Sequence, residues 1–288
     1  MKVGECYPQK ISVVVVIYKT AIEDSITLNS IKKSVANNPH LQTIYTFILV
    51  NNGPQNLQDV KQDSNFIVIN NSINSISHAY NLALKVAEEL DSDWLLLMDQ
   101  DTEIDQHFLE KLAEDSEKLN FHGSVVCIVP TIFDGITQIS PSRRFPGGVH
   151  RPLRKYKEYI GGEIYAIGSC SSIRLSFLKE LKGFDERYVI DSVDRWLFKQ
   201  IAIRGKLIYL LKGRIRHNLS VRNYEKLSEA RYKSIINSEL YFIKEHYSIF
   251  DRLIYALRIV IRIIYFSFFE KNMKLSRITF SHIKNIFM

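Results

Sequence analysis

Apolar runs and helical patterns alternate along the first 220 residues of the chain. Residues Ile11–Tyr18 (ISVVVVIY) form a continuous β-branched run, which is typical of a strand buried on both faces of a sheet. Further strands are predicted at 43–50, 66–70, 93–98, 125–129 and 207–211, and helices at 21–37, 77–90, 175–181 and 196–203. This alternation predicts an α/β domain built on a right-handed, doubly wound, mostly parallel sheet.

One segment of the second half breaks the alternation. Residues 140–162 combine several prolines and glycines with a cluster of basic side chains. This composition predicts either a mobile basic loop that becomes ordered on an anionic ligand or a solvated surface insertion. The basic side chains are Arg143, Arg144, Arg151, Arg154 and Lys155.

The pattern beyond the last strand is helical. A helix of mixed polarity is predicted at 229–247, and a strongly apolar one at 253–269 carries Arg258 and Arg262 on one face, four residues apart. An arginine near the middle of a bilayer costs about 2.5 to 3.5 kcal/mol, so a membrane-spanning helix is disfavoured. The pattern favours a helix in the plane of a membrane, with its arginines at the level of the phosphates. The alternative is a helix packed on the protein with its arginines in solvent.

The charge distribution supports a division of the chain at about residue 220. Of its 288 residues 46% are hydrophobic, which excludes a disordered chain, and the net charge is +7. Residues 1–220 carry 26 basic and 25 acidic side chains, whereas residues 221–288 carry 12 and 6. We therefore predict a catalytic domain at 1–220, with halves at about 1–105 and 106–220, and a basic amphipathic tail at 221–288. Positive charge confined to an aromatic-rich tail indicates an anionic membrane surface rather than a nucleic acid.

The cysteines and the N-terminus bear on location. Cys6, Cys127 and Cys170 are too few for a disulfide framework and lack metal-ligand spacing, which fits a reducing environment. Residues 1–10 are polar and lack the apolar core of a signal peptide. These features predict a cytoplasmic protein that associates peripherally with the inner face of the cell membrane.

Polar clusters follow three of the predicted strands, at 18–20, 51–53 and 99–101. Ligands of parallel sheets bind beyond the carboxyl ends of the strands, so these clusters are expected to converge on one site. Asp99 and Asp101, one residue apart, are suited to Mg²⁺ or Mn²⁺ bridging a diphosphate. The alternative is a surface turn in which Asp101 or Thr102 caps a helix.

The chain resembles family 2 glycosyltransferases of the GT-A fold, which is Rossmann-like, and in particular rhamnosyltransferase-like enzymes of bacterial surface-polysaccharide synthesis. The resemblance covers about residues 11–220 and rests on an ordered set of blocks. These are VVVVIYKT, LVNNGPQ, NSISHAYNLAL, WLLLMDQD, AIGSCSSIRLSFLKELKGFDERY, VIDSVDRWLFKQIAIRG and RHNLS.

The resemblance implies a binding site for a nucleoside-diphosphate sugar, with uracil or thymine as the base. Tyr18 and Thr20 are expected to line the nucleotide pocket, and Asn52 to lie near the base. Asn51 stands where many relatives have an aspartate that contacts the base, and its amide can donate as well as accept. Asn81 is expected to hold the pocket loop, the alternative being a helix-face residue with local bonds only.

A second acidic pair, Asp191 and Asp194, precedes the predicted helix at 196–203. The resemblance implies that Asp194 is the general base and Asp191 its support, with an ambiguity of one position between them. The alternative is that either carboxylate merely caps the helix. His217 is expected to bind the metal or the diphosphate, unless its role is purely structural.

Together these features predict an inverting glycosyltransferase that uses a dTDP- or UDP-sugar and a divalent cation (Mn or Mg). The acceptor is expected to be a hydroxyl of a glycan or of a lipid-linked molecule in capsule- or O-antigen-type synthesis. Two alternatives are a sugar-nucleotide nucleotidyltransferase and an inactive membrane-associated scaffold. The scaffold is suggested by Asn51, and by Ser75 and Cys170 where relatives favour glycine.

Overall fold

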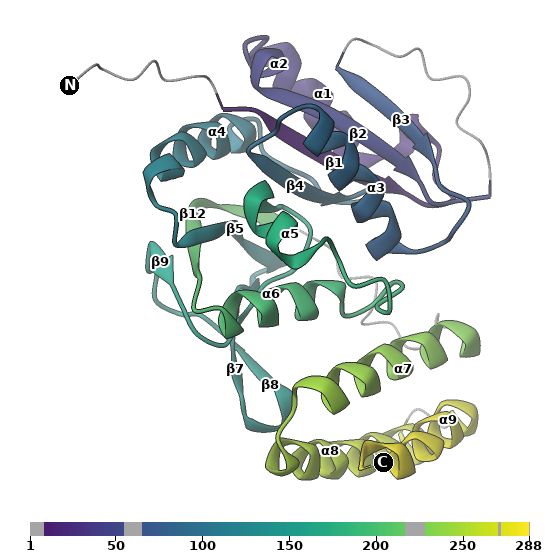
Figure 1. Cartoon of the computed structure of the whole chain (residues 1–288). Coiled ribbons are helices and arrows are strands. Elements are labelled where there is room, and N and C mark those ends of the chain that lie inside the picture. Colours follow the sequence, from purple (N-terminus) through teal and green to yellow (C-terminus); the bar gives the residue numbers. More distant parts are fainter. Residues whose placement is uncertain (1–8, 55–64, 217–227, 270–271, 288) are drawn as a thin grey trace.

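The computed structural model describes residues 9–54, 65–216, 228–269 and 272–287, and its centre is one large sheet (Figure 1). Strands β3, β2, β1 and β4 are parallel, β5 and β12 are parallel, and β11 runs antiparallel to β4 and β5 between these two groups. The strand order is β3 (Phe66–Asn70), β2 (Tyr45–Asn51), β1 (Ile11–Ile17), β4 (Trp94–Asp99), β11 (Ser171–Arg174), β5 (Val125–Asp134), β12 (Leu207–Arg216) and β9 (Tyr159–Ile160), with β6 (Thr137–Ser140) paired to β5. The predicted α/β class with a mostly parallel sheet is confirmed.

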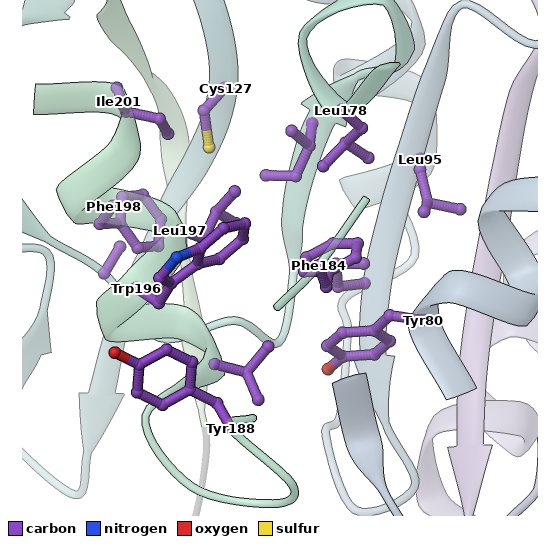
Figure 2. Close-up of a cluster of buried hydrophobic side chains, with 14 of the residues drawn as sticks. Tyr80, Leu95, Cys127, Leu178, Phe184, Tyr188, Trp196, Leu197, Phe198 and Ile201 are labelled. Atoms are coloured by element: carbon purple, nitrogen blue, oxygen red, sulfur yellow. The ribbon is translucent and has the colours of Figure 1, made fainter. Parts of the chain in front are cut away.

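Helices cover both faces of this sheet because the central strands are apolar on both. Val14 and Val16 of β1 pack with one set of helices, and Val13 and Val15 with the other. On the first face Trp196 and Tyr80 point into the same core from opposite sides, with Phe184 between them (Figure 2). The helices of the domain are α1 (Ile26–Asn37), α2 (Leu41–Ile44), α3 (Ile76–Glu89), α4 (Phe108–Lys118), α5 (Leu175–Leu181) and α6 (Val193–Ile203).

The first predicted helix begins later than expected. Residues 22–24 form a single 3₁₀ turn, and α1 starts at Ile26 because the Ser25 hydroxyl accepts a hydrogen bond from the Leu28 amide as an N-cap. Because α1 begins only at Ile26, residues 18–25 form a connection at the carboxyl end of β1, where the first polar cluster lies.

The expectation of a mobile loop at residues 140–162 is wrong, whereas the alternative of a surface insertion agrees with the exposure of Arg143, Arg151, Arg154 and Lys155. Strands β7 (Ser142–Phe145) and β8 (Val149–Pro152) form an antiparallel hairpin, and β10 (Ile164–Tyr165) adds a third strand. The physical reason lies in the pairing of the charges, because the Arg144 guanidinium is only partly exposed and lies 2.9 Å from an Asp251 carboxylate oxygen. The segment is therefore an ordered part of the protein.

Three C-terminal helices follow, α7 (Glu229–His246), α8 (Ile249–Phe268) and α9 (Met273–Ile283), the last of which the sequence did not predict, and the turn of this hairpin docks on α8 (Figure 1). The Gly147 amide donates a hydrogen bond to Asp251, and its carbonyl accepts one from Arg258. Phe242 and Ile259 join the core that contains Trp196. The C-terminal helices are thus packed against the domain.

Of the two interpretations of the apolar helix, packing on the protein agrees with the structure, with Arg258 exposed and Arg262 partly buried. Both arginines also bond within the protein, because Arg258 donates to Gly147 and Arg262 forms a 3.0 Å ion pair with Glu239. The rest of the exposed face of α8 is largely apolar. Among the described residues, no helix has the length and apolarity needed to cross a bilayer.

Candidate active site

A cleft of about 730 Å³ lies at the carboxyl ends of the parallel strands. The register pairs Ile17 with Asn51 and Val16 with Asp99, so the residues that follow β1, β2 and β4 meet at one edge. The predicted convergence of the three polar clusters is therefore confirmed. The cleft is lined there by Val16, Tyr18, Asn52, Leu97, Asp99, Gln100 and Asp101.

Three of the predicted nucleotide-binding residues do not belong to the described lining of the cleft. They are Thr20, Asn51 and Asn81. Thr20 donates a hydrogen bond to the Tyr18 carbonyl. Asn51 is buried, accepts a hydrogen bond from the Gly53 amide and donates one to Asn70, so its amide fixes the turn after β2. Asn52, the next residue, reaches the cleft in its place.

Asn81 lies on α3 and bonds to a segment about a hundred residues away. Its amide group donates to the Phe184 carbonyl and to Glu186, and its oxygen accepts from the Phe184 amide. These bonds are not local, so that alternative is wrong. The segment they hold includes Phe184, which lines the cleft, and any role of Asn81 in donor binding stays a prediction.

The Asp99–Asp101 turn is held by the start of α1. The Gln100 side chain accepts from the Tyr18 amide at 2.7 Å, and its carbonyl accepts from Thr27 and Ser25. The capping alternative for Asp101 or Thr102 is wrong, since α4 begins only at Phe108. The turn therefore presents both carboxylates to the cleft.

Burial raises the pKa of Asp99 to about 7, and the nearby charges of Asp101 and Asp194 add to the effect. A divalent cation relieves this kind of repulsion, and the carboxylates of Asp99 and Asp101 are the hard oxygen donors that Mg²⁺ and Mn²⁺ prefer. The described residues contain no group of three or more His, Cys, Asp or Glu that would hold a metal. Substrate oxygens and water could supply further ligands. His217 lies outside the described residues.

Asp194 lies in the first turn of α6, which begins at Val193 and not at Trp196 as expected. Its Oδ2 accepts a hydrogen bond of 2.7 Å from the Tyr165 hydroxyl, and its Oδ1 accepts one of 2.7 Å from the Arg195 amide. Burial raises the pKa of this carboxyl group, whereas these hydrogen bonds lower it. The carboxylate is thus buried, oriented and directed into the cleft.

Asp191 lines the same cleft but has a cationic partner. Arg231 of α7 holds both of its oxygens, at 2.6 and 2.9 Å. Burial raises the pKa of Asp191, and the guanidinium group opposes that shift. The two aspartates therefore differ in environment, since a neutral phenol orients Asp194 and a cation neutralises Asp191.

Residues of the C-terminal helices form the far wall of the cleft, which the sequence analysis missed. They are Arg231, Tyr232, Ile235 and Glu239 from α7, and Arg262 from α8. A signal was present, because residues 231, 235 and 239 are spaced by four and lie on one helix face. Tyr165, Ser169 and Arg195 are further lining residues that the sequence did not single out.

Residues next to the cleft include non-glycine residues with left-handed backbones. Ser192 has φ = 66° beside Asp191, and Cys170 has φ = 64° beside Ser169. This conformation costs about 1 kcal/mol without a glycine, and such strain clusters at functional sites. A glycine would adopt this conformation at the position of Cys170 without that cost. Ser75 caps α3 by accepting from the His78 amide.

The model of glycosyl transferase family 2 matches residues 12–182, which include β1, the Asp99–Asp101 turn and about half of the cleft lining, and the chain belongs to that family. It is therefore a glycosyltransferase, and its fold is the GT-A fold expected above. No curated protein sequence matches it significantly.

Solved structures of glycosyltransferases resemble the chain in fold. The structure of S. aureus TarS 1-349 has a TM-score of 0.52 at 17% identity, covering 92% of this chain and 74% of that one. The mannosyltransferase PcManGT from Pyrobaculum calidifontis, in complex with GDP-Man and Mn²⁺, has a TM-score of 0.53 at 13% identity, covering 83% of this chain and 64% of that one. At such identities the likeness concerns the fold alone.

Proposed function

We propose that this protein is an inverting glycosyltransferase that moves a sugar from a nucleoside-diphosphate sugar to a hydroxyl of a glycan or lipid-linked acceptor in cell-surface polysaccharide synthesis. The observation that carries the proposal is the placement of Asp194. This buried and oriented carboxylate opens into the same cleft as the Asp99–Asp101 turn. One cleft therefore holds a candidate base and a candidate diphosphate site.

The donor proposal is supported by the neighbours in fold. S. aureus TarS has been solved with UDP-GlcNAc, and PcManGT with GDP-Man and Mn²⁺. In this chain Tyr18 and Asn52 would face the nucleotide of a dTDP- or UDP-sugar. Asp99 and Asp101 would hold the divalent ion, which when bound would neutralise charge on the diphosphate.

The reaction is a single displacement. Asp194 takes the proton of the acceptor hydroxyl while that oxygen attacks the anomeric carbon from the face opposite the diphosphate. The bond from the anomeric carbon to the diphosphate oxygen breaks, and its electron pair leaves with the nucleoside diphosphate. Asp191 is the weaker candidate for the base because Arg231 neutralises it.

We also propose that the C-terminal helices hold the enzyme at the inner face of the cell membrane, and the exposed face of α8 supports this. Exposed apolar residues recur along it at intervals of three or four, forming one stripe. The stripe consists of Phe250, Leu253, Leu257, Ile261, Ile264 and Phe268. Compared with the sequence prediction, Arg262 is turned toward Glu239, whereas Arg258 remains exposed beside the stripe, where it could meet lipid phosphates.

The test is a screen of nucleotide sugars for metal-dependent release of nucleoside diphosphate, repeated with Asp101→Ala and Asp194→Asn. We expect a released nucleoside diphosphate, a product of inverted configuration, and loss of activity in both variants. Release of pyrophosphate would indicate a nucleotidyltransferase instead. Absence of any metal-dependent nucleotide binding would support an inactive scaffold, and a product of retained configuration would refute inversion.

A further inference from the structure

The cleft extends beyond the part that a nucleotide sugar would occupy. One end lies at the strand ends, around Asp99 and Asp101, and the other lies against α7 and α8. Asp194 lines the region between them. In an inverting displacement the acceptor approaches from the side opposite the diphosphate. If the proposed function holds, the acceptor therefore lies against the wall that α7 and α8 provide.

This wall is rich in guanidinium groups. Arg231 of α7 and Arg262 of α8 line it, paired with the carboxylates of Asp191 and Glu239, and Arg195 of the neighbouring α6 lines the same cleft. The pair with Asp191 uses one hydrogen on each of two nitrogens of Arg231, and an arginine has five N–H donors. The Arg231 side chain also remains about 30% accessible to solvent. Guanidinium groups bind phosphate oxygens in pairs, so this wall is suited to a phosphate.

Helix α8 connects the wall to the apolar stripe. Arg262 lies on its inner face, where Glu239 holds it, while Ile261 and Ile264 are exposed beside it. A helix is about 10 Å across, so a molecule bound against the wall lies within one helix diameter of the surface proposed to enter the lipid. This arrangement suits an amphiphile whose charged group sits inside the cleft and whose tail stays in the bilayer.

We propose that the wall formed by α7 and α8 is an acceptor subsite for a lipid-linked diphosphate, with Arg231 and Arg262 binding its phosphate oxygens. This inference rests on the proposed function, because it assigns the acceptor side of that site. It names the chemical class of the acceptor as a sugar joined through a diphosphate to an apolar chain.

The test measures binding of a fluorescent isoprenyl diphosphate in detergent micelles to the full-length protein, with UDP and Mn²⁺ saturating the donor side. The isoprenyl alcohol of the same length and free pyrophosphate are the matched probes. We expect the diphosphate to bind at least about tenfold more tightly than either, and Arg231→Gln to lose about tenfold of that affinity. Arg277→Gln, an exposed arginine of α9 outside the cleft lining, is expected to match the wild type.

Removing Arg231 or Arg262 alone leaves the partner carboxylate of Asp191 or Glu239 without its cation, so two double variants are added, Asp191→Asn with Arg231→Gln and Glu239→Gln with Arg262→Gln. We expect both to weaken diphosphate binding too, at an unchanged melting temperature. Equal binding of the diphosphate and the alcohol, or of wild type and Arg231→Gln, would overturn the inference, and so would equal binding of pyrophosphate. UDP binding in the presence of Mn²⁺ is measured separately, and its loss in the wild type would overturn the proposed function instead.

Discussion

The hydroxyl of Tyr165 donates a hydrogen bond of 2.7 Å to Oδ2 of Asp194 across 29 residues of sequence. Tyr165 ends β10 in the three-stranded sheet, whereas Asp194 lies in the first turn of α6, so the bond joins two separate parts of the fold. It stabilises the charged form of a carboxyl group that burial would otherwise protonate. Tyr165 is therefore a positioning residue for the proposed base.

Replacing Tyr165 with phenylalanine is expected to move the acid limb of the pH-rate profile to higher pH. The base works as a carboxylate, and loss of a hydrogen bond that lowers its pKa raises that pKa. Activity of Tyr165→Phe should therefore fall at low pH and recover as the pH rises. The measurement is kcat/KM against pH, with Tyr159→Phe, an exposed tyrosine of β9, as the control. An unshifted limb would refute the positioning role.

The two aspartates of the α6 region are expected to differ in their effect on turnover. Asp194→Asn removes the proposed base and should lower the single-turnover rate by about 10²- to 10⁴-fold. Asp191→Asn removes only the partner of Arg231 and should cost less. Measuring both at saturating donor separates chemistry from binding. The reverse order of losses would assign the base to Asp191.

The part of the cleft at the strand ends, where the donor is proposed to bind, was predictable because it follows from strand periodicity. A buried β-branched run places its polar successors at the sheet edge, so Tyr18, Asn52 and Asp99 converge as expected. Asn51 does not line the cleft because adjacent residues at the end of a strand point in opposite directions, and its side-chain amide donates to Asn70 instead. Which of two neighbours faces a cleft depends on the register of the end of β2.

The far wall of the cleft, where the acceptor is proposed to bind, could not be predicted because it depends on tertiary packing. Arg231 reaches Asp191 from 40 residues away, and no local pattern shows that α7 returns to the cleft. The hairpin at 142–152 was missed because its basic composition suggested a loop; Arg143 and Arg151 are exposed, whereas Arg144 is paired with Asp251. Long-range ion pairs of this kind give polar segments an ordered structure that composition does not indicate.

His150 of β8 is expected to make stability depend on pH. Burial, with the charges of Arg195, Arg144 and Arg258, lowers the pKa of His150 to about 4. The folded state thus disfavours the protonated form of His150. The contribution of neutral His150 to the free energy of unfolding is therefore complete above pH 6.5 and is lost as the pH falls toward 4. The loss is up to about 3 kcal/mol. Urea unfolding of the wild type and His150→Gln at pH 7 and pH 4.5 tests this, and an equal pH dependence in both would contradict it.

Gly147 in the β7–β8 turn and Gly135 in the turn between β5 and β6 offer a matched pair of substitutions. Gly147 and Gly135 have similar positive φ angles of 69° and 59°. A Cβ on Gly147 would lie 2.1 Å from a side-chain carbon of Ile254 on α8, whereas one on Gly135 would meet nothing within 4 Å. Gly135→Ala should therefore cost about 1 kcal/mol of unfolding free energy, and Gly147→Ala about 1 to 3 kcal/mol more. Equal losses would mean that the turn does not need its contact with α8.

The apolar stripe of α8 is expected to bind anionic vesicles. Each large apolar side chain that leaves water contributes about 1.5 to 3 kcal/mol, so Leu257→Ser with Ile261→Ser should weaken co-sedimentation with phosphatidylglycerol vesicles by at least tenfold. The control is Phe121→Ser with Ile136→Ser, which removes two exposed apolar side chains away from the C-terminal helices. A competing explanation is that the stripe joins two copies of the chain. Light scattering without vesicles tests it by measuring the oligomeric state. If the wild type is a dimer, the α8 variant is a monomer and vesicle binding is unchanged, the stripe joins two copies of the chain and does not contact lipid.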